Sequence, residues 1–147
     1  MAKMLPRVSM VTLGVSNLAA SVAFYRDGLG WETRVQDDVA FIDCDGFILA
    51  LFGRADLAKD AGIENTPPAT FNGMSLAHNV GSPEAVGEVF AIARNAGARV
   101  VKQPHKTYWG GYSGYFADPD GFLWEVAHNP FWPLDKNGHP HLPADEA

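Results

Sequence analysis

The feature that most constrains the fold of this chain is an internal repeat. Residues 41–47 and 116–122 read FIDCDGF and FADPDGF, so five of the seven positions coincide in order. Each segment follows the same succession of strand, helix and strand patterns. A repeated supersecondary unit cannot bury its apolar face alone and is stabilised by its copy. The sequence therefore predicts two copies of one βαβββ module.

The first copy begins with residues 8–15, where Val11, Leu13 and Val15 recur at the two-residue spacing of a strand. Residues 18–29 change to helical spacing, after a possible cap at Ser16 or Asn17, and end at glycines. Three short strands are predicted next, at residues 31–35, 39–43 and 47–52. The last two are joined by an Asp-Gly turn, which favours a hairpin because the turn needs positive φ.

Residues 53–73 are polar, contain two successive prolines and show no sustained period, so they are read as a connection with a short helix at 55–61. The second copy then repeats the order, with a strand at 74–80 and a helix from Pro83 to about Asn95 that Ser82 caps. Its remaining strands are predicted at residues 100–103, 114–117 and 122–127.

These assignments define one domain over residues 5–129 and a C-terminal tail over residues 130–147. Within the domain, module one covers about 5–53, the linker about 54–73 and module two about 74–129. The tail begins with an apolar, proline-rich stretch that we expect to lie over its own domain or a partner subunit.

Composition narrows the function classes. The chain is 47% hydrophobic and 19% charged, which supports a folded core. Its net charge of −6 argues against nucleic acid and mildly favours a neutral or cationic ligand. The lone Cys44 cannot form an internal disulfide, and no apolar run approaches the ~20 residues that span a bilayer. We therefore expect a cytoplasmic protein that associates with neither membrane nor nucleic acid.

Three segments now carry a family likeness: VTLGVSNL at 11–18, FYRDGLG at 24–30 and FADPDGFLWEV at 116–126. They resemble the vicinal oxygen chelate superfamily, which includes glyoxalase I, bleomycin-resistance proteins and extradiol dioxygenases. The resemblance implies an α+β fold in which two βαβββ modules form a curled mixed sheet around a cavity. It also implies a homodimer, since relatives commonly pair and sheet edges need cover. Because one scaffold hosts many reactions, it leaves the chemistry open.

In the metal-dependent members of that superfamily, four inward positions supply the ligands, usually His, Gln or Glu. The resemblance places these positions at Met10, Ala50, Ser75 and Glu125. Divalent first-row metals prefer imidazole, carboxylate or thiolate. Alanine offers no donor atom, a thioether suits Cu(I), and a serine hydroxyl is a weak ligand. We therefore expect no metal and no cofactor, and a cavity floor more suited to a hydrophobic molecule.

Glu125 lies inside the apolar strand at 122–127, where a carboxylate must be solvated, paired or neutralised by a raised pKa. One reading makes it a general acid or base, or a carboxylate that recognises the ligand. The other makes it a remnant of a metal site, now paired with a neighbour such as a tyrosine. The sequence leaves both open.

Residues 104–112 read PHKTYWGGY and gather titratable, aromatic and glycine residues in a predicted loop. Such loops are often functional, and aromatic walls with a few polar groups form small-molecule pockets. We expect His105, Tyr108, Trp109 and Tyr112 at the rim of the cavity. The alternative is a loop that buries its own aromatic rings.

The other histidines and the cysteine are weaker candidates. His78 shares strand parity with residues expected to face a helix, so it is read as structural. His128 ends the last strand and is a minor candidate at the cavity mouth. His139 and His141 belong to the tail and are expected to contact solvent or a partner, and Cys44 has no neighbouring base that would activate it.

Three functions follow from these residues. The first is a metal-free binder of a small aromatic or hydrophobic molecule, resembling the bleomycin-resistance branch and using stacking and cation–π contacts. The second is a metal-independent lyase or isomerase in which Glu125 moves a proton. The third is a metal-dependent lyase or dioxygenase with displaced ligands, in which Glu125 acts with His105 or His128.

Overall fold

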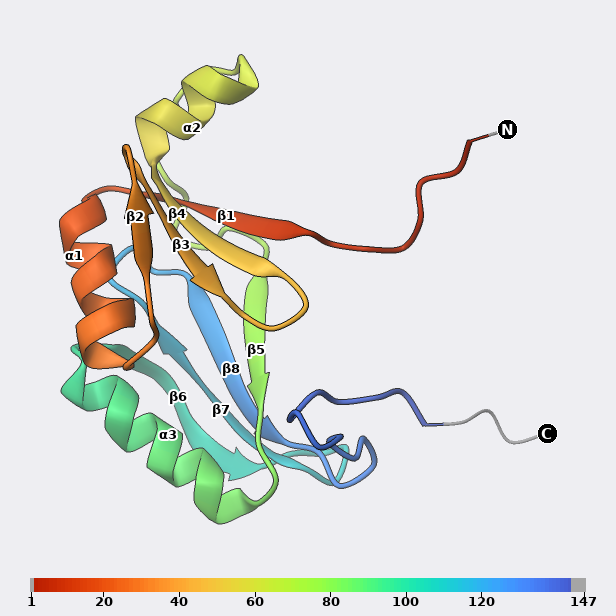
Figure 1. Cartoon of the computed structure of the whole chain (residues 1–147). Coiled ribbons are helices and arrows are strands. Elements are labelled where there is room, and N and C mark those ends of the chain that lie inside the picture. Colours follow the sequence, from red (N-terminus) through yellow and green to blue (C-terminus); the bar gives the residue numbers. More distant parts are fainter. Residues whose placement is uncertain (1, 144–147) are drawn as a thin grey trace. The chain divides into compact units, whose positions relative to one another are not determined.

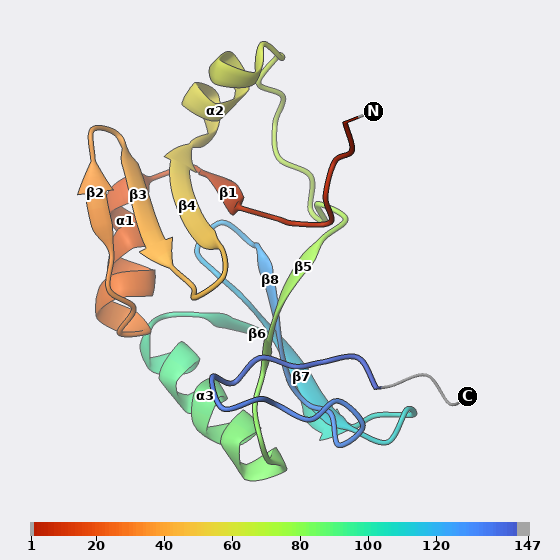
Figure 2. The ribbon, with the colours of Figure 1, turned by 45° about the vertical axis from the view of Figure 1, so that its right-hand side comes forward.

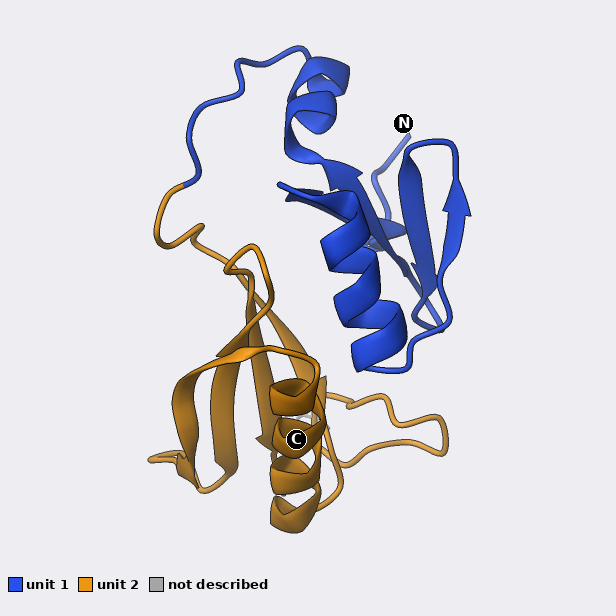
Figure 3. Ribbon diagram, turned by 90° about the vertical axis from the view of Figure 1, so that its left-hand side faces the viewer, with its two compact units in different colours: residues 1–68 blue, residues 69–147 orange. Residues whose placement is uncertain are grey.

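The structure is a computed structural model, and it describes residues 2–143. The chain divides between Pro68 and Ala69 into two compact units, coloured separately in Figure 3. The division falls inside the polar segment that follows the first repeat copy. Each unit contains one βαβββ module, and each is described below by itself.

Unit 1 contains a mixed four-stranded sheet in the order β1-β4-β3-β2, with a helix along one of its faces (Figure 1). Strands β1 and β4 are parallel, and the other neighbours are antiparallel. Its elements are β1 (Met10–Val15), α1 (Leu18–Val22), the π-helical η1 (Ala23–Gly28), β2 (Arg34–Gln36), β3 (Val39–Asp43), β4 (Ile48–Gly53) and α2 (Arg54–Ala61).

The first helix differs from the regular α-helix expected over residues 18–29. It begins as predicted at an Asn17 cap, whose Oδ1 accepts a hydrogen bond from the Ala20 N–H at 3.0 Å. It then widens, and the Leu29 N–H donates to the Phe24 carbonyl five residues back. The wider turn accompanies the burial of two successive aromatic residues, Phe24 and Tyr25, whose rings meet edge to face at 4.9 Å.

Unit 2 repeats this topology, with the strand order β5-β8-β7-β6 and the helix α3 along one face of the sheet (Figure 2). Strands β5 and β8 are parallel, and the remaining pairs are antiparallel. The elements are β5 (Ser75–Asn79), α3 (Pro83–Asn95), β6 (Arg99–Lys106), β7 (Tyr112–Ala117) and β8 (Leu123–His128). The predicted α+β fold with two βαβββ modules is confirmed, and each mixed sheet is a hydrogen-bonded unit of its own.

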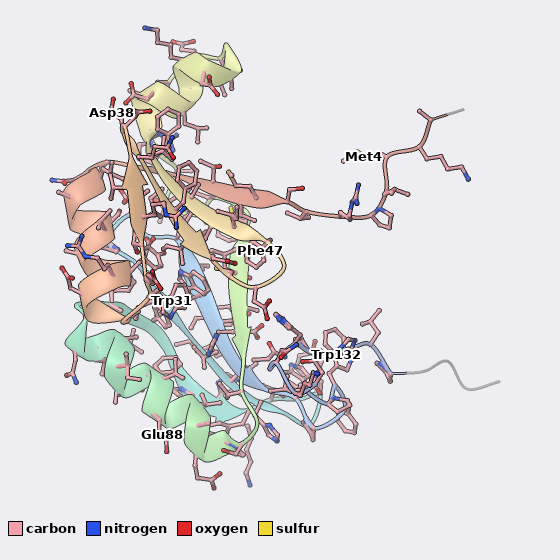
Figure 4. All side chains as sticks on the ribbon, viewed as in Figure 1. Met4, Trp31, Asp38, Phe47, Glu88 and Trp132 are labelled. Atoms are coloured by element: carbon pink, nitrogen blue, oxygen red, sulfur yellow. The ribbon has the colours of Figure 1, made fainter. Side chains whose placement is uncertain are left out.

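Aromatic rings form the core between α3 and the second sheet. Phe90 of α3 meets Phe116 edge to face with centroids 6.0 Å apart, and Phe116 stacks on Trp124 at 6.4 Å. Glu88 lies on the outer side of α3 (Figure 4) and is exposed. We call the side of the sheet that carries α3 the helix face, and the other side the opposite face.

The two repeat turns share one side-chain hydrogen bond at equivalent positions. Asp43 Oδ1 accepts from the Asp45 N–H at 2.9 Å between β3 and β4, and Asp118 Oδ1 accepts from the Asp120 N–H at 3.0 Å between β7 and β8. The glycine that follows has positive φ in both turns, +118° in the first and +85° in the second. Phe47 marks the first turn in Figure 4. The repeat predicted from the sequence is therefore confirmed.

Residues 104–112 differ from the predicted loop. Strand β6 continues to Lys106 and β7 begins at Tyr112, so the segment is a β-hairpin with a short turn. Two register shifts in β6, between Val100 and Lys102 and between Lys102 and His105, accommodate extra residues. Such bulges allow Pro104 to stand inside a strand, beyond the end predicted for this strand at residue 103.

The described part of the tail, up to residue 143, folds back on itself. Leu134 and Pro140 form an isolated bridge around a turn in which Asp135 Oδ1 accepts hydrogen bonds from the backbone N–H groups of Asn137 and His139. Asp135 Oδ2 lies 2.8 Å from His141 Nε2. No helix within residues 2–143 is both long and apolar enough to cross a membrane.

Asp135 is expected to titrate far below an ordinary aspartate. The hydrogen bond from His141, followed by that from the His139 N–H, lowers the pKa of Asp135 from 3.8 to about 2. Because this pKa is lower in the folded chain, the turn's contribution to stability is present above pH 3.8 and is lost as the pH falls toward about 2. NMR titration of the Asp135 carboxyl carbon should give the low midpoint, whereas a midpoint near 4 would show that the turn is not formed in solution.

Candidate functional site

A row of polar side chains crosses the opposite face of the second sheet. Lys102 pairs with Tyr115 and Tyr115 with Glu125, so the polar row spans β6, β7 and β8, and Ala77 of β5 pairs with Glu125 at its end. Residues paired across a ladder project to the same side, and neighbours along a strand alternate. Since Trp124 packs toward the helix, Glu125 projects away from it.

Glu125 is half-buried and hydrogen-bonded within this row. The Tyr115 hydroxyl donates to Glu125 Oε2 at 3.3 Å. Burial, and then the charge of Glu125 and this hydrogen bond, raise the pKa of Tyr115 above its ordinary 10. The phenol therefore stays protonated at neutral pH and serves as a donor. Glu125 is thus paired with a tyrosine, and this pairing is consistent with both readings of Glu125 that the sequence left open.

A recess of about 420 Å³ lies beside this pair on the opposite face. Its volume falls within the range of roughly 300–1,000 Å³ that is typical of small-molecule sites. Its wall combines apolar residues with three polar side chains, among them Met74, Val101, Leu123, Ser75, Lys102 and Tyr115. Glu125 does not line the recess itself and reaches it through the Tyr115 hydroxyl.

The four positions expected from the resemblance occupy equivalent places in the two sheets. Met10 pairs with Ile48, and Ala50 pairs with Thr12. Met10 and Ala50 therefore lie on the same face of the first sheet, two residues apart in the register. Ser75 pairs with Leu123 and Glu125 with Ala77, which gives the same offset in the second sheet. Met10 is 43% exposed and Ala50 is 1% exposed. The repeat thus relates Met10 to Ser75 and Ala50 to Glu125.

The residues at these positions do not fit the metal that the resemblance implies. The two positions in unit 1 hold a thioether and a methyl group, and the two in unit 2 hold a hydroxyl and one carboxylate that already accepts the Tyr115 hydrogen bond. Within residues 2–143, no three His, Cys, Asp or Glu side chains lie close enough together to hold a metal ion. His105 and His128 are therefore not gathered with Glu125 into a displaced ligand set.

The hairpin residues predicted at the cavity rim lie in different places. His105 pairs with Ser113, and Ser113 with Ala127, which puts His105 on the same face as Glu125. Tyr112 pairs with His128 and has the parity of Phe116, so it lies on the helix face, away from Glu125. Tyr108 is fully exposed at the tip of the hairpin, and the Trp109 ring packs over Gly111.

The remaining histidines differ in their surroundings. His78 pairs with Val126 on the helix face, as its parity predicted, and desolvation lowers its pKa. His128 Nδ1 lies 3.3 Å from the Val80 carbonyl oxygen at the end of β8.

Two residues of the site, Tyr115 and Lys102, were not predicted from the sequence. Tyr115 could have been found by counting back from the Asp-Gly turn, since hairpin pairing puts it opposite Glu125. Lys102 could not, because its alignment with Tyr115 depends on the register shifts in β6.

The family profile and a solved structure of a similar protein both relate this chain to the glyoxalases. The profile of the Glyoxalase/Bleomycin resistance protein/Dioxygenase superfamily matches residues 7–126. A glyoxalase-related enzyme from Fulvimarina pelagi is 34% identical, with a TM-score of 0.85 over 95% of this chain and 100% of that one.

More distant similarity supports the fold alone. Lactoylglutathione lyase from Agrobacterium tumefaciens is 23% identical, with a TM-score of 0.67 over 90% of this chain and 100% of that one. A glyoxalase/bleomycin resistance protein/dioxygenase from Nocardioides is 24% identical, with a TM-score of 0.72 over 86% and 85%. No functionally curated protein matches significantly.

Proposed function

Since this chain belongs to the Glyoxalase/Bleomycin resistance protein/Dioxygenase superfamily, we propose that it binds a small hydrophobic or aromatic molecule in a metal-free site on the opposite face of its second sheet. The observation that carries the proposal is the recess of about 420 Å³ beside the hydrogen-bonded Tyr115 and Glu125. The molecule's apolar part would lie against Val101 and Leu123, and its polar part near Tyr115.

The side chains at the family's ligand positions support this choice. Ser75 lines the recess at one of these positions, and its hydroxyl beside Val101 and Leu123 suits apolar contact better than a hydrated cation. The Tyr115 hydroxyl, held by its hydrogen bond to the Glu125 carboxylate, provides a fixed polar anchor in the recess, which gives orientation and specificity. The proposal therefore needs no cofactor.

A second candidate is a metal-independent lyase or isomerase, favoured by the partial burial of Glu125 and its contact with Tyr115. In that case the Tyr115 hydroxyl would pass its proton to the Glu125 carboxylate while its oxygen accepts a proton from the bound molecule, so that Tyr115 stays protonated. Turnover of a ligand, lost in Glu125→Gln, would distinguish this candidate from simple binding.

We also retain the homodimer as part of the proposal. The sheets end at β1 and β2 in unit 1 and at β5 and β6 in unit 2, and exposed strand edges are commonly covered by association.

The metal-free site can be tested on the purified chain. We expect elemental analysis to find no stoichiometric zinc, nickel, iron or manganese, and a thermal-shift screen to find ligands among aromatic and hydrophobic molecules rather than metal salts. About one such metal per chain, removable only by a chelator, would contradict the proposal.

Glu125→Gln should weaken binding of a ligand found in that screen by about tenfold, or change the pH dependence of its binding, while leaving the fold intact. The isostere keeps the shape and removes the charge that the Tyr115 hydroxyl contacts. Glu88→Gln, on the exposed outer side of α3, is the matched control and should change neither. Titration calorimetry measures both variants, and equal affinities for wild type and Glu125→Gln at every pH would place the site elsewhere.

A further inference from the structure

A second recess, of about 630 Å³, lies in unit 2 at the end of the helix face. It is bounded by Pro83 at the start of α3, by Gly110 and Gly111 in the β6–β7 turn, and by Pro130 after β8. Five of its nine lining residues belong to the hairpin at residues 104–112, yet Tyr112 has the strand parity of Phe116 and not that of Glu125. The recess is therefore separate from the proposed Glu125 site.

Three polar side chains lie in one row along this recess. Lys106 pairs with Tyr112, and Tyr112 pairs with His128, so the three are neighbours across β6, β7 and β8. The next row of the same face, Gly114 and Val126, belongs to the apolar core under Phe90. The polar row thus begins where the core between sheet and helix ends.

The turn that borders the recess is held in place by its own hydrogen bonds. The Thr107 N–H donates to the Gly111 carbonyl at 2.9 Å, and the Gly111 N–H donates to Thr107 Oγ1 at 2.9 Å. A Cβ at Gly111 would lie 1.9 Å from the Trp109 ring, and one at Gly110 3.0 Å from the Phe131 ring. Both glycines are therefore packed against aromatic rings, and this wall is bare backbone in a fixed conformation.

The charges around the recess are of both signs. Lys106 lies in the row, and Glu84 lies on the wall formed by α3. Neither forms an ion pair within residues 2–143. The rings of Pro83, Pro130 and Tyr112 also line the recess. A molecule that satisfies this wall carries a carboxylate for Lys106, an ammonium group for Glu84 and an apolar group for the rings.

We propose that this recess binds a free amino acid with an apolar or aromatic side chain, or a zwitterion of similar size and chemistry. His128 Nδ1 lies 3.3 Å from the Val80 carbonyl oxygen, and the tautomer that donates to this oxygen leaves Nε2 as an acceptor for the ammonium group. A zwitterion also has no net charge, so the −6 charge of the chain does not repel it as it would an anion.

The proposal is tested by titrating the ¹⁵N-labelled full chain with L-phenylalanine and following the amide resonances. We expect saturable shifts at residues 106–111 and 128. Phenethylamine, which lacks the carboxylate, and 3-phenylpropanoate, which lacks the ammonium group, should each bind about tenfold more weakly, because each leaves one charged side chain unmatched. Equal binding of all three compounds would refute the zwitterion assignment.

Variants separate this recess from the Glu125 site. Lys106→Ala should weaken phenylalanine binding about tenfold, with resonances outside the hairpin unchanged. Lys102→Ala removes the same charge four residues earlier on the opposite face and should leave phenylalanine binding unchanged, as should Glu125→Gln. Shifts centred on residues 75, 115 and 125, or no saturable shift with phenylalanine, leucine or tryptophan, would overturn the proposal whatever the outcome for the Glu125 site.

Discussion

Gly114→Ala is expected to lower the free energy of unfolding by about 3 kcal/mol, at the upper end of the usual cost of overpacking. A Cβ at this position in β7 would lie 2.7 Å from the Lys102 carbonyl oxygen, 2.8 Å from the Pro104 nitrogen and 2.8 Å from the Phe90 ring. Two of these atoms are backbone atoms of β6, so the strand itself must move. Urea denaturation followed by circular dichroism measures the loss.

Gly87→Ala is the matched control for this substitution. Gly87 is exposed in the middle of α3, and a Cβ there would meet no atom within 4 Å. Alanine has the higher helix propensity, so this variant should be more stable than the wild type by roughly 0.5–1 kcal/mol. Two variants of equal stability would show that β6 does not lie against Gly114 as described.

Asp118→Ala should lower the free energy of unfolding by about 2 kcal/mol, whereas the repeat-equivalent Asp43→Ala should cost less than about 1 kcal/mol. Asp118 is 5% exposed, and its Oδ1 accepts from the N–H groups of both Asp120 and Phe122. Removing it leaves a buried donor unpaired. Asp43 is exposed, and its Oδ1 accepts from the Asp45 N–H. Water can take the place of this carboxylate as the acceptor.

The comparison uses two carboxylates that differ in burial but not in their place in the module. Chemical denaturation of both variants under one set of conditions provides the difference directly. Similar losses would mean that the second turn is solvated in solution, and that burial does not distinguish the copies.

Elements with strong local signals were predicted closely from the sequence. Strand β3 (Val39–Asp43) has the predicted bounds. Helix α3 begins after the Ser82 cap and ends at Asn95, as predicted. The two Asp-Gly turns were likewise local, since each depends on positive φ at its glycine, joined in the first turn by Asp45. These features depend on a few neighbouring residues, which is why periodicity and capping were sufficient.

Features set by pairing between strands were not predicted. The extension of β6 to Lys106 depends on bulges that keep Pro104 beside β7, and no local pattern encodes them. The π-helical turn at Ala23–Gly28 depends on how two adjacent aromatic rings pack into the core. In both cases tertiary contacts outweigh the preference of the segment itself.

The candidate site shows the same division. The direction of Glu125 followed from its alternation with Trp124 and is as expected. Its partner Tyr115 and the placement of Tyr112 required the register of the ladder, in which one residue changes the face. Because residues 104–112 were read as a loop, their alternation between faces was not considered. Tyr112 and Glu125 were therefore predicted in one site, although they lie on opposite faces of the sheet.

The completion of each sheet within its own module has an evolutionary consequence. A duplicated βαβββ unit that satisfies its own backbone hydrogen bonds can accumulate substitutions without disturbing the strand pairing of its twin. The first copy here has only Met10 and Ala50 where the second has Ser75 and Glu125. One half can thus become a purely structural scaffold while the other explores new chemistry by single substitutions. Duplication of the module therefore allows the fold to persist even where one copy has lost the residues of an earlier activity.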